Sequence, residues 1–403
     1  MDNTAASPAP LSIALVGTRG VPARYGGFET CIEEVGKRLA ARGHRVVVYC
    51  RASKDSDCSA TDYQGMHLVH LPALKHRPLE TLSHTALSVG HLLAHRVDVA
   101  VVFNAANAPF LPILRAAGVP VATHVDGLEW LRAKWRGIGK RYYRLAESLA
   151  VRWSDALIAD ARGIQDYYRQ EFNASTTYLA YGAPILDAGV NHRLSEMELE
   201  AKKYHLVVAR FEPENHVHLI VEGYVRSSAT HPLIVVGSAP YSDVYTRHIK
   251  SLGDERVRFV GGVWDQELLD QLYSNALIYW HGHSVGGTNP SLLRAMGAGV
   301  ATNAYDVAFN REVLGESGEY FADVAAIPDL IKSAEDPTCD TMLRGKKAQA
   351  EALRYNWDWV ADGYEELCRN LVEGGSGLDG SNSGRRTGAY PLKPSVAMTG
   401  ARL

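Results

Sequence analysis

Two glycine-rich segments contain the residue types that bind phosphate or sugar ligands. The first, Gly17 to Glu29, contains four glycines: Gly17, Gly20, Gly26 and Gly27. Glycine lets backbone N–H groups approach an anion or a sugar closely, and the N-terminus of a following helix adds about half a positive charge. We therefore predict a ligand-binding loop that includes Arg19. The alternative is that these glycines only make turns.

The second segment, His281 to Gly299, has the stronger helix-start signal. Thr288 or Asn289 suits an N-cap, Pro290 suits the first helical position, and Gly286 with Gly287 would let phosphate oxygens approach the helix N-terminus. This predicts a phosphate-binding loop that uses no lysine.

His281 and His283 stand two residues apart in the same segment, but no carboxylate or cysteine cluster accompanies them. We expect these histidines to hydrogen-bond to ligand or backbone, and we predict no metal site.

Arg210 follows the apolar segment 204–209. A guanidinium at the C-terminal end of a parallel strand is well placed to bind a pyrophosphate. The alternative is a surface salt bridge to Glu212 or Glu214.

A third group, His124, Asp126 and Glu129, follows the predicted strand 119–124. A histidine and a carboxylate at this position could orient an acceptor hydroxyl or take its proton, and Asp126 is the first candidate. Asp126 could instead cap the next turn.

The elements that position these residues alternate between strand and helix. A strand at 11–16, a helix at 29–42 and a strand at 45–50 form one β-α-β unit, and the pattern starts again at 204–209. The other predicted strands are 97–103, 119–124, 156–159, 233–236, 257–260, 277–280 and 300–302. This pattern predicts an α/β chain with two Rossmann-like, doubly wound domains.

The predicted organisation has five parts. They are a disordered tail at 1–10, a first domain at 11–190, a second at 191–345, a C-terminal helix at 346–372 that crosses back to the first domain, and a disordered Gly/Ser-rich tail at 373–403.

Composition narrows the class of protein. The 403 residues have a net charge of −3, which argues against nucleic acid as the ligand. Five cysteines without a C-x-x-C pair, no apparent leader and no run of 18 apolar residues favour a cytoplasmic protein. Binding of NAD is disfavoured, because Cys50-Arg51 stand where an acidic residue would end the second strand. Arg51 could bind a 2′-phosphate, so NADP is only a weak alternative.

Residues 130–152 are rich in aromatic residues and carry seven basic residues against one acid. Interleaved aromatic and basic residues suit contact with anionic lipid head groups. A second basic stretch from Lys75 to Arg96 could extend this surface; the alternative is an ordinary solvated helix face.

Five motifs spread over residues 11–372 resemble those of a known family. They are GTRGVPARYGGFE, R-x-x-P-E, HGHSVGGTNP, FNREVLG and YNWDWVADGYEEL. The chain resembles the family 4 retaining glycosyltransferases of GT-B architecture and, more narrowly, the bacterial rhamnosyltransferase-like subgroup of polysaccharide and exopolysaccharide assembly. The resemblance implies two domains facing a cleft, an acceptor domain and a nucleotide-sugar donor domain, with no metal and no separate cofactor.

The resemblance also implies roles for residues. Phosphate or donor binding would fall to Arg210, His283, Gly286, Gly287, Thr288, Asn289 and Arg294, with Gly17, Arg19 and Gly20 of the first loop. The acceptor side would include Asp126, His124, Glu129, Gly26 and Gly27. The expected donor is dTDP-rhamnose, and the expected acceptor is a lipid-linked saccharide at the inner face of the cell membrane.

Two departures from the family pattern open an alternative. Asn215 stands where the family has a lysine, with His216 as a candidate substitute, and Gly286 and Arg294 stand where the wider family has two glutamates. Loss of the first glutamate is expected in the subgroup and loss of the second is not, because arginine accepts no hydrogen bond. The competing reading is a catalytically weakened or silent GT-B protein with a binding role; a GT-B-type epimerase ranks lower.

Overall fold

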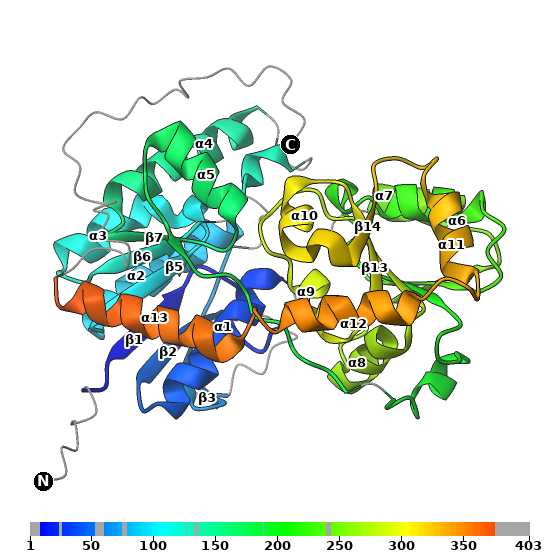
Figure 1. Cartoon of the computed structure of the whole chain (residues 1–403). Coiled ribbons are helices and arrows are strands. Elements are labelled where there is room, and N and C mark those ends of the chain that lie inside the picture. The colour runs from blue at the N-terminus through cyan, green and yellow to red at the C-terminus, as the bar shows by residue number, and fades with distance from the viewer. Residues whose placement is uncertain are drawn as a thin grey trace, which may run out of the picture. The chain divides into compact units, whose positions relative to one another are not determined.

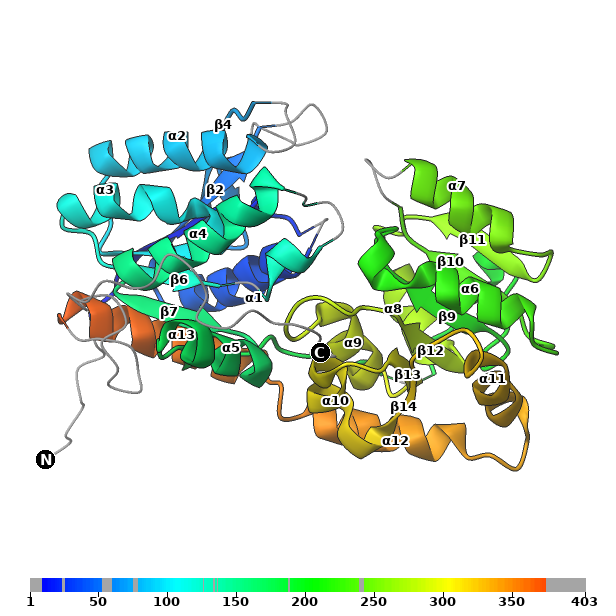
Figure 2. The same cartoon turned by 90° about the horizontal axis from the view of Figure 1, so that it is seen from above.

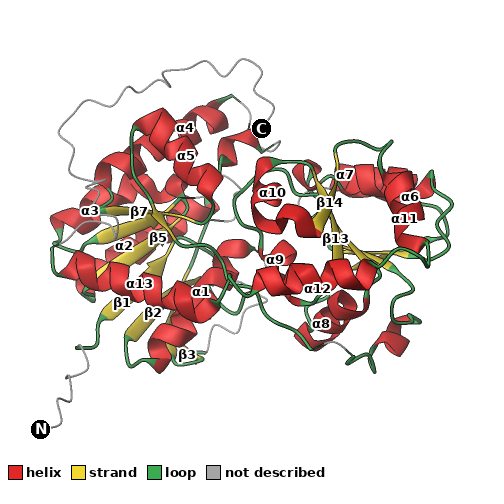
Figure 3. Cartoon of the chain, viewed as in Figure 1, coloured by secondary structure: helices red, strands yellow, loops and turns green. Residues whose placement is uncertain are grey.

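The computed structural model describes residues 9–23, 26–52, 60–74, 79–125, 127–132, 135, 137–187, 189–238 and 243–374. These residues form two compact units (Figure 1). Unit 1 contains the described parts of 9–125, 137–179 and 357–374, and unit 2 contains those of 127–135 and 180–356. The predicted α/β chain with two parallel-sheet domains is confirmed (Figure 3).

The boundaries between the units differ from the predicted positions at 190 and 345. The chain passes from unit 1 to unit 2 after Leu179 and returns at Trp357. The two connecting segments pair inside unit 2, where the Ala183 amide donates to the Tyr355 carbonyl at 2.7 Å. The segment Gly127–Arg136 is also assigned to unit 2, although the chain on both sides of it belongs to unit 1.

Unit 1 is built on a sheet with the strand order β3-β4-β2-β1-β5-β6-β7-β8. The strands are β1 Ser12–Val16, β2 Arg45–Arg51, β3 Asp62–Tyr63, β4 Met66–Leu71, β5 Val99–Phe103, β6 Val121–His124, β7 Ala156–Ala159 and β8 Thr177–Tyr178. All neighbours pair in parallel except β3 with β4. The sequence pattern did not predict β3, β4 or β8.

The helices of unit 1 are α1 Gly27–Ala41, α2 Glu80–Ala94, α3 Leu111–Ala116, α4 Ile138–Trp153, α5 Arg162–Phe172 and α13 Trp357–Val372. Helix α13 lies beside α1, as Figures 1 and 2 both show. The Tyr364 hydroxyl lies 3.5 Å from the Cys31 sulfur in this interface. The last described helix, α13, is therefore part of unit 1.

Unit 2 has a parallel sheet with the order β11-β10-β9-β12-β13-β14. Its strands are β9 His205–Val208, β10 Leu233–Val236, β11 Val257–Gly261, β12 Ile278–His281, β13 Ala301–Tyr305 and β14 Gly318–Phe321. Its helices are α6 Val217–Val225, α7 Asp243–Leu252, α8 Gln266–Asn275, α9 Pro290–Gly297, α10 Ala308–Leu314, α11 Ile327–Glu335 and α12 Thr341–Ala352. Alternate residues of the central strands feed two apolar clusters, as expected for a sheet covered on both faces.

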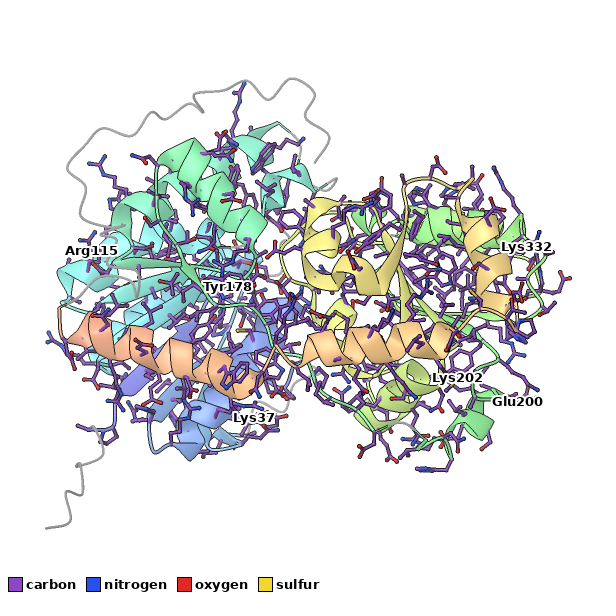
Figure 4. The ribbon with its side chains drawn as sticks, in the orientation of Figure 1. Lys37, Arg115, Tyr178, Glu200, Lys202 and Lys332 are labelled. Carbon is purple, nitrogen blue, oxygen red and sulfur yellow. The ribbon has the colours of Figure 1, made fainter. Side chains whose placement is uncertain are left out.

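The segment that enters unit 2 is held by a partly buried lysine. Lys202, labelled in Figure 4, donates to the carbonyls of Ser274 and Ala276 at 2.9 and 3.0 Å. These carbonyls end α8 and precede β12, and burial lowers the pKa of the Lys202 ammonium. The segment that contains Lys202 is thus packed against α8 and β12 of unit 2.

In both sheets the strand order reverses once along the chain, between β1 and β5 in unit 1 and between β9 and β12 in unit 2. Loops that leave the carboxyl ends of such neighbouring strands turn in opposite directions and leave a crevice where ligands of doubly wound sheets bind. A ligand site is therefore expected at each of these two strand-order reversals. No described helix is long and apolar enough to cross a membrane.

Candidate functional site

The loops after β9 and β12, at the strand-order reversal of unit 2, contact each other through main-chain and side-chain atoms. The Ser284 amide and hydroxyl both donate to the Glu214 carbonyl at 3.0 Å. The His216 ring lies 2.8 Å from the Gly282 carbonyl through Nδ1. A Cβ on Gly282 would lie 2.1 Å from the Asn215 carbonyl oxygen, so this approach requires glycine.

The loop after β12 leads into α9 as the sequence predicts. Asn289 is the N-cap, with its side-chain oxygen accepting from the Ser291 amide at 3.0 Å, and Pro290 begins the helix. Gly286 has a φ of +132°, which side-chain-bearing residues rarely adopt. Thr288 is buried. The geometry suits a phosphate at a helix N-terminus.

Arg210 stands two residues beyond the end of β9, beside this loop. Its carbonyl accepts a 2.7 Å hydrogen bond from the Asn215 side chain. Burial lowers the pKa of His283 well below its usual value, and the positive charges of Arg210 and Arg132 add to that effect. The structure therefore brings Arg210 and the His283 loop together, and it adds Arg132, which the sequence analysis did not single out for this site.

The two histidines of the loop stack on each other, with ring centroids 4.5 Å apart. His281 is wholly buried, and burial lowers its pKa to about 3. Among the described residues no group of three His, Cys, Asp or Glu side chains is placed to hold a metal ion.

Arg294 lies on α9 and forms an ion pair with Asp270 on α8. Burial raises the pKa of Asp270, and the charge of Arg294 opposes that rise. The Arg294 side chain, which was predicted to lie at the donor site, thus joins α9 to α8. Asn303 on β13 is engaged as well, since its side-chain oxygen accepts from Arg344 at 2.9 Å.

The described residues between 127 and 135, which belong to unit 2, include a polar cluster. The Glu129 carboxylate accepts from the Trp135 indole at 3.1 Å and lies 2.5 Å from Arg132. Arg132 in turn lies 3.6 Å from the Glu214 carboxylate. Glu129, predicted for the acceptor side, is therefore held by its own segment.

In unit 1 the first glycine loop lies at the strand-order reversal. Gly17 and Gly20 have φ values of +103° and +95°, and a Cβ on them would lie 2.3 Å from the Phe103 carbonyl and 2.5 Å from the Cys50 sulfur. Side chains occupy two of the loop amides: the Arg19 amide donates to Glu29 at 3.1 Å and the Gly20 amide to Thr18 at 3.1 Å. In this conformation Gly17 and Gly20 avoid the clashes that a side chain would cause, and the Arg19 and Gly20 amides already have hydrogen-bond partners.

Gly26 and Gly27 start α1, with Gly26 as the N-cap. Arg19 and Arg51 both pair with Glu80, at 3.4 and 3.2 Å. This three-residue cluster was not predicted from the sequence, because Glu80 is 29 positions from Arg51 and no motif joins them.

His124 is wholly buried at the end of β6, 2.8 Å from the Tyr364 hydroxyl. Burial lowers its pKa to about 3. The described contacts join β6 to α13 and leave the ring no exposed surface for an acceptor. Asp126, the first catalytic candidate, lies outside the described residues, as do Arg24 and Tyr25 of the glycine loop.

The basic and aromatic stretch forms a mixed surface on α4. Ile138 is 84% exposed and Leu145 is 44% exposed, with Lys140, Arg141 and Arg152 exposed on the same helix. Leu87 and Leu93 on α2 and Ile113 on α3 are each 45% exposed. The acids of these helices are occupied: Glu80 pairs with arginines, and Glu147 is buried and accepts from Tyr167 at 2.8 Å.

Two Rossmann-like units, each with ligand loops at its strand-order reversal, define the GT-B fold, and solved structures support this. A sucrose-phosphate synthase from Thermosynechococcus elongatus is 20% identical, with a TM-score of 0.78 over 90% of this chain and 100% of that one. The Anabaena protein Alr3699/HepE, solved with UDP, is 16% identical, with a TM-score of 0.71 over 89% of this chain and 100% of that one. An α,α-trehalose-phosphate synthase (UDP-forming) from Burkholderia vietnamiensis is 12% identical, with a TM-score of 0.67 over 90% of this chain and 100% of that one.

Family comparisons agree with the fold. Residues 192–336 match the family described as glycosyl transferases group 1, and residues 11–184 match a domain of unknown function, DUF1972. No curated protein gives a significant match. The chain has the GT-B fold, and residues 192–336 of its second unit match a group 1 glycosyl transferase domain.

Proposed function

We propose that the protein transfers a hexose or deoxyhexose from a nucleotide sugar to a lipid-linked saccharide during cell-surface polysaccharide synthesis. The proposed donor is dTDP-rhamnose, the proposed location is the inner face of the cell membrane, and the proposed reaction needs no metal ion. The observation that carries the proposal is the strand-order reversal between β9 and β12, with Arg210 in the loop after β9 and the capped N-terminus of α9 after β12.

The chemistry follows from the charge on the leaving group. When the bond between the sugar and the diphosphate breaks, negative charge develops on the phosphate oxygens. A fixed guanidinium and amides at a helix N-terminus stabilise that charge without reorganising. Arg210 and the amides from Gly286 to Asn289 are the proposed donors of these interactions. The Anabaena neighbour was solved with UDP and with UDP-glucose, which supports a nucleoside diphosphate sugar as the class of donor.

The choice of donor sugar and base depends on the resemblance to rhamnosyltransferases. The lipid-linked acceptor and the membrane location are supported by the mixed surface of α4, where exposed Ile138 and Leu145 alternate with cations. The finding that favours the silent alternative is the Arg294–Asp270 ion pair at the position of a family glutamate.

Calorimetry with dTDP-rhamnose, UDP-glucose and a GDP-sugar tests the proposal, with EDTA in one series and Mg²⁺ in another. We expect saturable binding that is strongest for dTDP-rhamnose and unaffected by EDTA. Arg210→Ala should weaken binding of the donor at least about tenfold, because it removes a charge-assisted contact to the phosphates. Arg193→Ala is the matched control, since Arg193 pairs with Glu196 and Asp265 away from both loops.

Sugar transfer to a lipid-linked saccharide by the same protein separates the two readings. Donor binding without transfer or donor hydrolysis would support the silent alternative. Absence of binding to every nucleotide sugar would reject both.

A further inference from the structure

The Glu214 carboxylate is buried at the donor crevice without a hydrogen bond. Its side chain is 5% exposed, and neither Oε1 nor Oε2 accepts a hydrogen bond. The only ion pair recorded for it among the described residues joins Oε1 to Arg132 at 3.6 Å. A carboxylate offers about four acceptor positions, so most of its capacity is unused.

Such an arrangement is costly for folding. Buried polar groups in native proteins are almost always hydrogen-bonded, and burying a charge is unfavourable unless it is paired and also hydrogen-bonded. Arg132 does not fully offset this cost, because it also pairs with Glu129. Residues that break a local packing rule in this way are concentrated at functional sites.

The position of Glu214 links it to the ligand loops. It lies in the short 3₁₀ turn Pro213–Asn215 after β9, and its own carbonyl binds both the amide and the hydroxyl of Ser284 after β12. The residue is therefore fixed at the strand-order reversal, where a doubly wound sheet binds its ligand.

The two positions of the family glutamates and the described residue Glu129 do not supply this carboxylate. At position 286 a glycine has a φ of +132°, and at position 294 an arginine is paired with Asp270. The Glu129 carboxylate is held by Trp135 and Arg132. A sugar presents neighbouring hydroxyl donors, and a carboxylate whose oxygens accept no hydrogen bond is the complementary acceptor.

We propose that Glu214 binds hydroxyl groups of the donor sugar and thereby selects the sugar, rather than the nucleotide. The inference depends on the proposed function, because it requires a nucleotide-sugar donor in this crevice. The competing role is structural, with Glu214 serving only as a counter-ion for Arg132.

Paired affinity measurements separate these roles. The affinities of dTDP and dTDP-rhamnose, or of UDP and UDP-glucose if the protein prefers that pair, are measured by calorimetry for the unaltered protein, Glu214→Gln and Glu214→Ala. We expect Glu214→Ala to weaken the nucleotide sugar at least about tenfold, with a smaller loss for Glu214→Gln, which keeps one acceptor oxygen. The nucleoside diphosphate alone should bind within about twofold of the unaltered protein. Glu222→Gln is the matched control, since Glu222 pairs with Arg226 on the surface of α6.

Thermal unfolding gives the second readout. If Glu214 serves the ligand, Glu214→Gln should melt at the same temperature as the unaltered protein or higher, because it removes a buried charge. Equal weakening of nucleotide and nucleotide sugar, or a melting temperature lower by about 3 °C or more in Glu214→Gln, would overturn the inference in favour of the structural role. If the unaltered protein bound no nucleotide at all, the proposed function would fail first and this inference with it.

Discussion

Arg294 on α9 and Asp270 on α8 form an ion pair whose side chains are 20% and 30% exposed. The family resemblance places a glutamate at position 294, and a simple expectation is that Arg294→Glu restores donor binding. The structure predicts otherwise, since the new carboxylate would face Asp270. We expect Arg294→Glu to lower the free energy of unfolding by about 1–2 kcal/mol without tightening donor binding.

The charge-swapped double variant Arg294→Glu/Asp270→Arg tests this explanation. It should recover most of the lost stability in thermal or urea unfolding, because the pair is restored in reverse. Arg311→Glu is the control: the pair of Arg311 with Asp306 is 54% and 36% exposed, so its loss should change the stability much less. Tighter donor binding by Arg294→Glu alone would contradict the assignment of Arg294 to a structural contact.

The close approach of Gly282 to the Asn215 carbonyl predicts a steric effect on the donor crevice. Gly282→Ala would place a Cβ 2.1 Å from that oxygen, so the β9 and β12 loops would have to separate. We expect a loss of about 1–3 kcal/mol in stability and at least tenfold weaker donor binding, measured by unfolding and calorimetry. Gly90→Ala on α2 has open space around it and should leave binding unchanged and stability equal or slightly higher. Unchanged donor binding in Gly282→Ala would show that the contact between the loops does not shape the site.

The Tyr364–His124 hydrogen bond predicts a structural role for His124, which the sequence predicts as a catalytic residue. Tyr364→Phe removes the 2.8 Å contact to a wholly buried imidazole and should lower stability by about 1–3 kcal/mol. Turnover per folded molecule should remain close to that of the unaltered protein, because the ring has no exposed surface. The check is activity at a temperature where both proteins are folded, together with thermal unfolding. A fall in kcat of a hundredfold or more with an unchanged melting temperature would instead support a catalytic role for His124.

Local sequence signals predicted the fold well, because apolar runs and helix starts are encoded by neighbouring residues. The strand 45–50 and the cap Asn289 followed by Pro290 depend on such signals, and both appear in the structure. The strands β3 and β8 have two residues each and little hydrophobic pattern, so no periodicity revealed them.

The site was only partly predictable, since its contacts join residues distant in sequence. Arg210 and the Gly286 loop could be proposed because each follows a strand in a parallel sheet. Nothing in the sequence joins Arg132 to Glu214, 82 positions apart, or Asp270 to Arg294 on the next helix. Asp126 remains a prediction.

The mixed surface of α4 predicts binding to anionic lipid. Each cation near such a membrane contributes about 1 kcal/mol, so Lys140→Glu/Arg141→Glu should weaken binding to phosphatidylserine-containing vesicles at least about tenfold. Ile138→Ser should weaken binding less, by removing one apolar contact. Vesicle sedimentation at two salt concentrations is the measurement. Lys332→Glu/Lys346→Glu, with the same charge change on exposed lysines of unit 2, should have little effect. Equal loss in both double variants would indicate net charge rather than this surface.

The buried His205–Glu335 contact predicts that acid destabilises unit 2. His205 is wholly buried and accepts from the Trp280 indole at 3.2 Å through Nδ1, so Nε2 carries the proton and donates to Glu335 at 3.1 Å. Burial alone would raise the pKa of Glu335, but hydrogen bonds from His205, Thr230 and His231 lower it from 4.5 to about 2. Burial also lowers the pKa of His205 from its usual 6.5.

Both folded-state pKa values are depressed, so the stabilisation is complete above the unfolded-state values. It declines below pH 6.5 as His205 gains a proton on unfolding, and further below pH 4.5 because of Glu335. Glu335→Gln should therefore cost about 1–3 kcal/mol at pH 7, and its difference from the unaltered protein should shrink as the pH falls from 4.5 toward 2. Urea unfolding at several pH values measures this, with the exposed Glu267→Gln as control. A difference that stayed constant over this range would mean that the Glu335 carboxylate contributes through packing rather than through its charge.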